Sequence, residues 1–373
     1  MKPHAVFLTN KIYIDKSLNE GGVRMCTEDY INLLSTKFEL LIFPVENRKS
    51  ILYRVLVKLG ISQYRDFKSP SKINELHRLL IQKNVEFLFL NQSNTAFFGI
   101  EVKKLVGRNL KVFICSHGNE SGDLLHFMTR FRASIPWYRH FFSSWTLGRT
   151  ILTEAKHRAG GINGVFTVSE VETQIENWLG AKRVLFVPRT ITNQFQFYNN
   201  RLGIVGFIGD LSHAPNYFGL KSLCDAINET GDYNNIQLRI VGSSFDIGTI
   251  LEKEYSFVSY LGYLKNEDVL IECESWSFFV NPVFYYSRGV TTKLGKALGL
   301  GIPVITTEIG CRGYHWERGV LPIVQTPVQM ASAILQLSSD IEKINYYRSQ
   351  VVEIVNSSPT YENLSDRLIN FVS

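Results

Sequence analysis

Short apolar runs alternate with stretches of helical periodicity along almost the whole chain. A run of Val, Ile, Leu and Phe without polar alternation is typical of a strand that is buried on both faces. Helical stretches such as Val23–Ser35 and Ile73–Gln82 lie between the runs. In the first half, the runs predict strands at His4–Leu8, Phe38–Phe43, Val85–Leu90, Lys111–Cys115, Gly164–Val168 and Val184–Val187. In the second half, they predict strands at Gly203–Ile208, Ile236–Val241, Val258–Leu261, Ser277–Val280, Pro303–Thr307 and Leu321–Val324.

This alternation predicts parallel α/β sheets, and 373 residues are enough for two domains that each bury a core. The polar, Asn-rich segment Pro188–Arg201 lacks helical periodicity and is interpreted as a hinge. We therefore expect an α/β protein with two Rossmann-like, doubly wound domains, residues 1–190 and 200–357, that face each other across a cleft. A C-terminal helix near residues 358–373 is free to pack back on the first domain. Ligands of such sheets bind at the carboxyl ends of the strands.

Composition and cysteine usage indicate the cellular compartment of the protein. The chain has 45% hydrophobic and 20% charged residues, as ordinary globular proteins do. No apolar run approaches the roughly 20 residues of a membrane span, and MKPHAVFLTN at the N-terminus has too short an apolar stretch for a signal peptide. The five cysteines are scattered without a C-x-x-C spacing, which favours reduced thiols. We expect a cytoplasmic protein.

Charge is unevenly spread between the two halves. Residues 1–190 carry 27 Lys and Arg against 16 Asp and Glu, whereas residues 191–373 carry 13 against 18. The first half therefore favours an anionic neighbour.

Several function classes are disfavoured by missing motifs. The chain has no G-x-G-x-x-G after a strand, no P-loop, no H-E-x-x-H and no G-x-S-x-G. Dehydrogenase, NTPase, metalloprotease and serine-hydrolase interpretations are therefore set aside. D-x-D is also missing, so we expect no metal and no other cofactor.

The stretch Ser287–Thr306 (SRGVTTKLGKALGLGIPVIT) carries the strongest chemical signal. A glycine-bearing turn leads into a short helical run, and the unpaired N–H groups and positive dipole of a helix start are a natural seat for phosphate. Lys293 and Arg288 are placed to stabilise negative charge there. The other residues expected near a diphosphate are Ser287, Gly289, Val290, Thr291, Thr292 and Lys296.

Three blocks of sequence resemble the family-4 glycosyltransferases of the two-domain GT-B fold. Val205–Gly219 is similar to the first strand and turn of the donor domain, Gly164–Pro188 to the end of the acceptor domain, and Ser287–Thr306 to the donor diphosphate segment. The resemblance covers most of the chain. It implies metal-independent transfer of a sugar from a nucleotide-sugar, usually with retention of anomeric configuration.

Further candidate residues follow predicted strands. His117 comes directly after Lys111–Cys115, where the resemblance implies a histidine that contacts the donor sugar or the acceptor, and a solvated loop histidine is the alternative. Asn119, Glu120 and Asp123 are candidates for acceptor binding, with helix capping an equal alternative for the two acids. The remaining donor-site candidates are Gly21, Gly22, Gly209, Asp210, Ser243 and Tyr263. A plain turn and helix cap is an equal alternative for the glycine pair, and a packing role is the alternative for Tyr263.

The sequence departs from the family pattern at two charged positions. Family members commonly carry two glutamates around the diphosphate turn, and the second binds ribose hydroxyls; the corresponding residues here are Arg288 and Lys296. The usual Asn-Gly after the last acceptor-domain strand is Arg189-Thr190. Lysine has only donors and cannot replace a carboxylate that accepts from ribose. We favour a transferase; the alternatives are a catalytically silent GT-B subunit that binds a partner or an acceptor polypeptide and, less favoured, a sugar-nucleotide epimerase.

The segment His126–Arg149 interleaves basic and aromatic side chains. Cations on anionic lipid and rings in the headgroup region are what an interfacial membrane segment needs. The expected membrane contacts are Arg130, Arg132, Trp137 and Arg139, and the alternative is that the rings pack in the core of the first domain. Nucleic acid is a poorer fit because no reader motif is present. The acceptor favoured by this segment is a lipid-linked or cell-envelope glycan at the inner face of the membrane, and soluble sugar or protein acceptors are the alternative.

Overall fold

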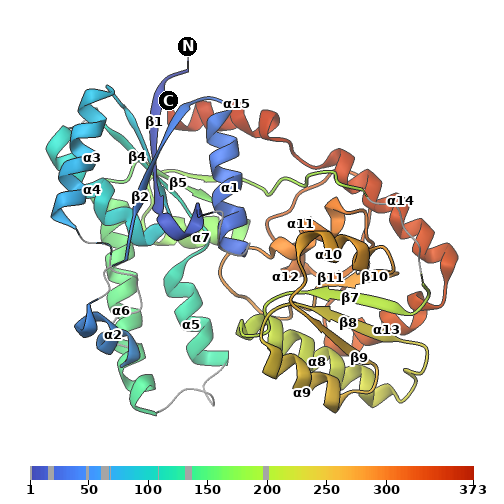
Figure 1. The fold of residues 1–373 in the computed structure, drawn as a ribbon. Helices are drawn as coiled ribbons and strands as arrows, with labels where there is room; N and C mark the ends of the chain where they lie inside the picture. The colour runs from blue at the N-terminus through green and yellow to red at the C-terminus, as the bar shows by residue number, and fades with distance from the viewer. Residues whose placement is uncertain are drawn as a thin grey trace. The chain divides into compact units, whose positions relative to one another are not determined.

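The computed structural model forms two compact units, each built on one parallel sheet (Figure 1). It describes residues 2–373 except 16–20, 48–49, 60–66, 68, 108, 131–136 and 196–200. The first unit comprises Met1–Pro188, Ser287–Val290 and Thr360–Ser373, and the second comprises Arg189–Tyr286 and Thr291–Pro359. Part of the predicted hinge, residues 196–200, lies outside the described residues.

The first sheet has six parallel strands in the order β2-β1-β3-β4-β5-β6. Its strands are β1 (His4–Asn10), β2 (Glu39–Val45), β3 (Phe87–Asn91), β4 (Lys111–Cys115), β5 (Gly164–Thr167) and β6 (Val184–Phe186). The helices of this unit are α1 (Gly22–Ser35), α2 (Ile51–Lys58), α3 (Pro70–Gln82), α4 (Ala96–Val106), α5 (Glu120–Arg130), α6 (Trp137–Gly160), α7 (Glu170–Trp178) and α15 (Tyr361–Val372), with 3₁₀ turns η1 (Lys11–Tyr13) and η2 (Ser93–Thr95).

Successive side chains of a strand point to opposite faces of the sheet, so alternate residues of the first sheet belong to two separate hydrophobic cores. Val6 and Leu8 pack with α3 and α4 on one face, and Ala5 and Phe7 pack with α1 and α15 on the other. Because helices cover both faces of the sheet, the strand sequences are continuous apolar runs. The C-terminal α15 belongs to this core through Leu364, Leu368 and Phe371 among others.

The second sheet also has six parallel strands, in the order β12-β11-β10-β7-β8-β9. Its strands are β7 (Ile204–Ile208), β8 (Gln237–Val241), β9 (Val258–Gly262), β10 (Phe278–Val280), β11 (Val304–Thr307) and β12 (Ile323–Val324). Its helices are α8 (Ala214–Thr230), α9 (Phe245–Glu254), α10 (Asn266–Cys273), α11 (Thr292–Gly299), α12 (Glu308–Cys311), α13 (Pro327–Ser338) and α14 (Ile341–Ser357). The α/β class and both predicted series of six strands are confirmed.

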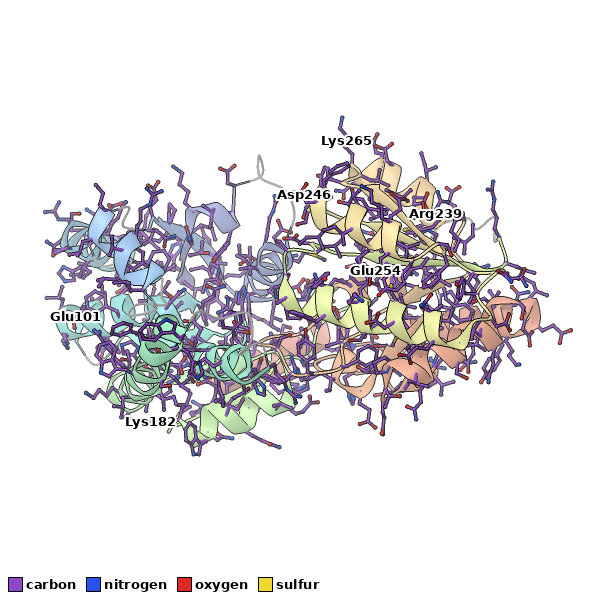
Figure 2. The ribbon with its side chains drawn as sticks, turned by 90° about the horizontal axis from the view of Figure 1, so that it is seen from below. Glu101, Lys182, Arg239, Asp246, Glu254 and Lys265 are labelled. Carbon is purple, nitrogen blue, oxygen red and sulfur yellow. The ribbon has the colours of Figure 1, made fainter. Side chains whose placement is uncertain are left out.

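Two apolar layers also sandwich the second sheet. Residues of α8, α9 and α13 pack on one face and residues of α11 and α14 on the other. Charged side chains such as Asp246, Glu254 and Lys265 extend outward from this unit (Figure 2). No helix within the described part of the chain is long and apolar enough to cross a membrane.

Candidate functional site

Each sheet reverses its strand order once, and polar residues gather at both reversals. In the first sheet the order turns between β1 and β3; in the second it turns between β7 and β10. The crevice outside the carboxyl ends of the strands at such a switch point is where doubly wound sheets bind ligands. The strand order brings residues from separate parts of the chain to each switch point. Because each sheet has one switch point, each unit has its own candidate site.

Asn91, the last residue of β3, orients His117 at the first switch point. The Nε2 atom of His117 lies 2.7 Å from Oδ1 of Asn91. The amide nitrogen of Asn91 donates to the hydroxyls of Thr9 and Thr27, at 2.7 and 2.9 Å. Because Thr27 gives its own proton to the carbonyl of Val23, its oxygen must accept from Asn91. The network therefore assigns the carbonyl oxygen of Asn91 to His117, which makes Nε2–H the donor and Nδ1 the acceptor of the neutral ring.

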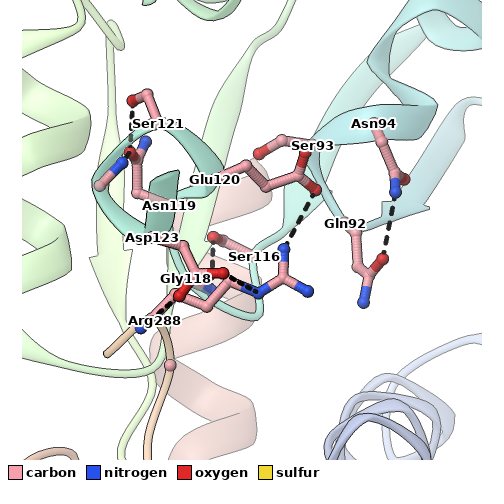
Figure 3. A network of polar contacts seen from close by, with 12 residues as sticks. Gln92, Ser93, Asn94, Ser116, Gly118, Asn119, Glu120, Ser121, Asp123 and Arg288 are labelled. Carbon is pink, nitrogen blue, oxygen red and sulfur yellow. Dashed lines mark hydrogen bonds and ion pairs between the residues drawn. The ribbon is translucent and has the colours of Figure 1, made fainter. Parts of the chain in front are cut away.

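Arg288 lies beside two acidic residues at the start of α5 (Figure 3). Its Nη1 is 3.6 Å from Oε1 of Glu120 and its Nε is 4.0 Å from Oδ2 of Asp123. Asp123 also accepts a 3.5 Å hydrogen bond from the backbone N–H of Arg288. Burial raises the pKa of Glu120 to about 8, although the positive charge of Arg288 opposes the rise. The structure thus brings Arg288, which the sequence analysis expected at the diphosphate, together with two residues that it expected at the acceptor.

A buried ionic network continues behind Glu120. Arg158 donates two 2.7 Å hydrogen bonds to the carboxylate of Glu176 and one of 2.7 Å to the hydroxyl of Ser93. Burial raises the pKa of Glu154, the charge of Glu176 adds to this rise, and Arg158 opposes it. Asn119 donates to Glu154 at 3.4 Å, while its carbonyl oxygen accepts from Ser121 Oγ and from the Gly122 N–H. Asn119 is therefore fully buried and caps α5; acceptor contact by Asn119, Glu120 and Asp123 stays a prediction.

Lys293 and Asn216 form the centre of the second site. The Lys293 ammonium donates a 2.6 Å hydrogen bond to Oδ1 of Asn216, and Asn216 donates at 2.8 Å to the carbonyl of Asp210. Gly209 directly follows β7, and a Cβ there would lie only 2.7 Å from Cε of Lys293. Burial lowers the pKa of Lys293 to about 8 and the charge of Asp210 opposes that shift. A half-buried cation with a neutral partner suits an anionic ligand.

The turns after β7 and β8 supply hydroxyl groups to Asp210. The Asp210 carboxylate accepts from the N–H and hydroxyl of Ser212 and from the hydroxyl of Ser244, at 2.8–2.9 Å. Burial acts to raise the pKa of Asp210, but hydrogen bonds from these serines and Ser243 outweigh it and lower the pKa. Tyr263, 59% exposed, directly follows β9. Contact of Ser243 and Tyr263 with a base stays a prediction.

The start of α11 is held from behind and left without a side-chain cap. Tyr314 donates its hydroxyl proton to the Thr291 carbonyl at 2.8 Å and accepts from the Gly295 N–H at 3.0 Å. The N-cap residue Thr291 makes no capping bond with its side chain and lies 3.3 Å from Oδ1 of Asn281. The first-turn N–H groups next to Lys293 are therefore available to an anion.

Other predicted site residues lie in less informative places. Gly21 is the N-cap of α1, and a Cβ there would meet no atom within 4 Å, so its small size is not required by packing in the first unit. Gly22 begins the same helix. Lys296 lies half-buried on α11. Burial raises the pKa of Cys273, and the charge of Lys296 opposes this rise. Ser287, Gly289 and Val290 belong to the first unit and Thr292 to the second.

The predicted membrane contacts are described only in part. Arg130 is exposed at the end of α5 and Trp137, 83% exposed, begins α6. Arg132 lies outside the described residues, as does the side chain of Arg139.

Three residues of these sites were missing from the sequence-based candidates: Asn91, Glu172 and Asn216. Asn216 belongs to the Pro-Asn pair of Val205–Gly219, and this pair was an available signal. Asn91 contacts His117, and Glu172 accepts a hydrogen bond from the backbone N–H of Gly289. Both contacts join residues that are far apart in the sequence, so no local motif indicates them.

Two doubly wound parallel sheets, each with polar groups at its switch point, define a two-domain α/β protein of the GT-B class. Residues 203–340, which belong to the second unit except for 287–290, match the family described as glycosyl transferases group 1. The chain therefore carries a glycosyl transferase group 1 domain and has the GT-B fold. No curated protein sequence matches the chain significantly.

Solved GT-B structures cover nearly the whole chain at low sequence identity. Sucrose-phosphate synthase from Thermosynechococcus elongatus is 15% identical with a TM-score of 0.68, over 99% of this chain and 98% of that one. HepE from Anabaena, in complex with UDP and glucose, is 12% identical with a TM-score of 0.64, over 99% and 98%. The lipopolysaccharide outer core galactosyltransferase WaaB is 11% identical with a TM-score of 0.60, over 98% and 99%. At such identities the likeness establishes the fold.

Proposed function

We propose that this protein is a metal-independent glycosyltransferase that moves a sugar from a nucleotide-sugar to a glycan or lipid-linked acceptor. The group 1 domain supports glycosyl transfer. A nucleotide-sugar donor agrees with the ligands of Anabaena HepE, and a cell-envelope glycan acceptor agrees with the activity named for WaaB. The reaction would serve polysaccharide or glycoconjugate synthesis in the cytoplasm, with a hexose as the transferred sugar and retention as the expected stereochemistry.

The pairing of Lys293 with the uncapped start of α11 carries this proposal. When the donor bond breaks, negative charge develops on the β-phosphate of the departing nucleoside diphosphate. Preorganised N–H groups and a fixed ammonium stabilise that charge without reorganising during the reaction. Asn216 holds the ammonium in place through a neutral carbonyl, so its charge is not cancelled by the partner.

The first unit supplies the groups for the acceptor side. His117, oriented by Asn91, can accept a hydrogen bond from a sugar hydroxyl through Nδ1 in its neutral form. Arg288 is a second candidate for the diphosphate, but the carboxylate of Asp123 already neutralises part of its charge. We therefore expect its contribution to transfer to be smaller than that of Lys293.

Titration of the protein with UDP, GDP, TDP and their common sugars tests the proposal. A donor that binds only the folded state increases the free energy of unfolding by RT ln(1 + [L]/Kd), and this raises the melting temperature. Ligand at millimolar concentration therefore reveals even weak binding. We expect one nucleotide series to bind, and release of its diphosphate when an acceptor glycan is added. If none of them produces heat or a melting shift, the silent GT-B subunit is the better interpretation.

The outer face of α6 supports a second proposal, association with an anionic membrane surface. Among the side chains of this helix that the structure describes, the buried ones are polar: Ser143, Thr146, Thr150, Glu154 and Arg158. The exposed positions instead include Trp137 at 83%, Trp145 at 55% and Leu152 at 62%. This inversion of the usual pattern places apolar groups outside, and the Arg149 guanidinium lies 5.4 Å from the Trp145 ring centre. Rings flanked by cations match an interfacial segment.

Sedimentation with vesicles tests the membrane association. Replacing both Trp137 and Trp145 by Ser, or both Arg130 and Arg149 by Glu, should strongly reduce sedimentation with anionic vesicles, since each cation near such a surface is worth about 1 kcal/mol. Trp178→Ser is the control, because Trp178 is 70% exposed on α7 of the same unit. Wild-type protein that stays in the supernatant at low salt would overturn the proposal.

A further inference from the structure

A buried carboxylate on α7 makes a hydrogen bond that its local sequence does not predict. Ser169-x-x-Glu172 has the spacing of a capping box, in which the glutamate serves the start of its own helix. Ser169 does cap α7, since its hydroxyl accepts from the Glu172 N–H at 3.3 Å. Oε1 of Glu172 accepts a 2.6 Å hydrogen bond from the backbone N–H of Gly289, 117 residues away in the sequence. Glu172 is 0% exposed, so this bond lies away from water.

Two glycines bring the backbone at Gly289 close to the loop that carries His117. Gly118 has φ of +111° and Gly289 has φ of +74°, values that favour glycine. A Cβ on Gly118 would lie 2.2 Å from the Gly289 nitrogen, and a Cβ on Gly289 would lie 2.6 Å from the His117 carbonyl oxygen. The two backbones therefore touch, and no larger residue fits at either position without movement.

The contacts fix a short piece of chain to the first unit. Ser287–Val290 packs with this unit, although the residues on both sides of it belong to the second. A hydrogen bond to a buried carboxylate is shorter and stronger than one between neutral groups. The carboxylate therefore holds the backbone next to Arg288, while Glu120 and Asp123 hold its side chain (Figure 3).

We propose that Glu172 is a positioning residue: its bond to the Gly289 N–H sets the place of Arg288 beside the His117 loop. The inference rests on the proposed function only where it concerns turnover. Its structural part, that this carboxylate anchors residues 287–290, is independent of any reaction. The competing interpretation is that Glu172 serves only the stability of α7.

Hydrogen exchange separates these two roles without any substrate. In Glu172→Ala, we expect the Gly289 amide to exchange at least tenfold faster than in the wild type. Ser169→Ala is the matched control, because it removes the cap of the same helix but leaves the Glu172 carboxylate; there the Gly289 amide should keep its protection. Glu172→Gln retains one acceptor oxygen and should restore part of the protection. Unchanged exchange in Glu172→Ala, or equal acceleration in Ser169→Ala, overturns the proposal.

A double-mutant comparison then measures the effect on transfer. With the donor found by titration, Glu172→Ala should lower kcat at least tenfold in the wild-type background and less than twofold in an Arg288→Ala background. Equal losses in both backgrounds would show that Glu172 does not act through Arg288. If no donor binds at all, the proposed function fails, and the exchange experiment still decides whether Glu172 anchors the segment.

Discussion

The two units share a sheet architecture but treat buried charge in opposite ways. The first unit buries five charged side chains to 4% exposure or less, namely Glu120, Glu154, Arg158, Glu172 and Glu176. Among the described residues of the second unit, no charged side chain reaches this limit, and the most buried one is Arg189 at 8%. The first site is thus built from charges that satisfy one another, whereas the second presents a cation whose partner is a neutral amide. A site of the first kind organises loops, and one of the second kind suits an incoming anion.

The largest expected effect is a loss of stability when Arg158, the centre of the buried ionic network in the first unit, is replaced. Arg158→Met leaves the Glu176 carboxylate buried without its bidentate partner, and breaking a buried pair in this way costs about 3–5 kcal/mol of unfolding free energy. Arg239→Met is the matched change in the second unit, where Arg239 lies 3.1 Å from Glu272 and both are partly exposed. We expect about 1 kcal/mol there. Urea unfolding measures both, and equal losses would contradict the comparison.

The next effect concerns the charge of Lys293. Lys293→Met should weaken donor binding at least tenfold at pH 7, because a charge-assisted contact is worth about 1.5–3 kcal/mol. Since burial lowers the pKa of Lys293 to about 8, raising the pH from 7 to 9 removes its positive charge and should weaken donor binding to the wild type. Calorimetric titration across this range checks both, with the exposed Lys265→Met as control. A pH slope that survives in Lys293→Met would assign the titration to another group.

The second site was more predictable than the first, for a physical reason. Lys293 and the start of α11 lie within one continuous segment, so helix-start chemistry could be inferred from local sequence. Strand order, by contrast, pairs Asn91 with His117 and Glu172 with Gly289, and single-sequence periodicity does not reveal strand order. The sequence also grouped Arg288 with Lys293, whereas packing assigns Arg288 to the first unit. Alternation of apolar runs predicted both sheets because it depends on burial alone.

A smaller effect should appear in the pH dependence of stability. Burial raises the pKa of Glu120 from 4.5 to about 8, so between these values the folded state holds a proton that the unfolded state releases. This contribution to stability is complete below about pH 4.5 and is lost as the pH rises through 8. Glu120→Gln should therefore gain stability relative to wild type between pH 5 and pH 8, by about 1 kcal/mol or more, since each pH unit in this window shifts the wild type by up to about 1.4 kcal/mol. Urea unfolding at both pH values tests this, with Glu267→Gln on the exposed face of α10 as control; the same difference in both variants would contradict it.

The smallest expected effect is at Lys296, where the chain departs from the family pattern. Lys296 lies one helical turn beyond Lys293 and its charge acts on Cys273, so we expect Lys296→Ala to change donor affinity by less than threefold. Lys296→Glu sharpens the test. If the nucleotide runs along α11, a carboxylate here can accept from ribose hydroxyls, and binding should be equal or tighter. If Lys296 contacts a phosphate instead, the new carboxylate repels it, and Lys296→Glu should bind more weakly than Lys296→Ala. Donor titration of the two variants decides, and affinities equal to wild type in both would show that the reversed charge has no part in donor binding.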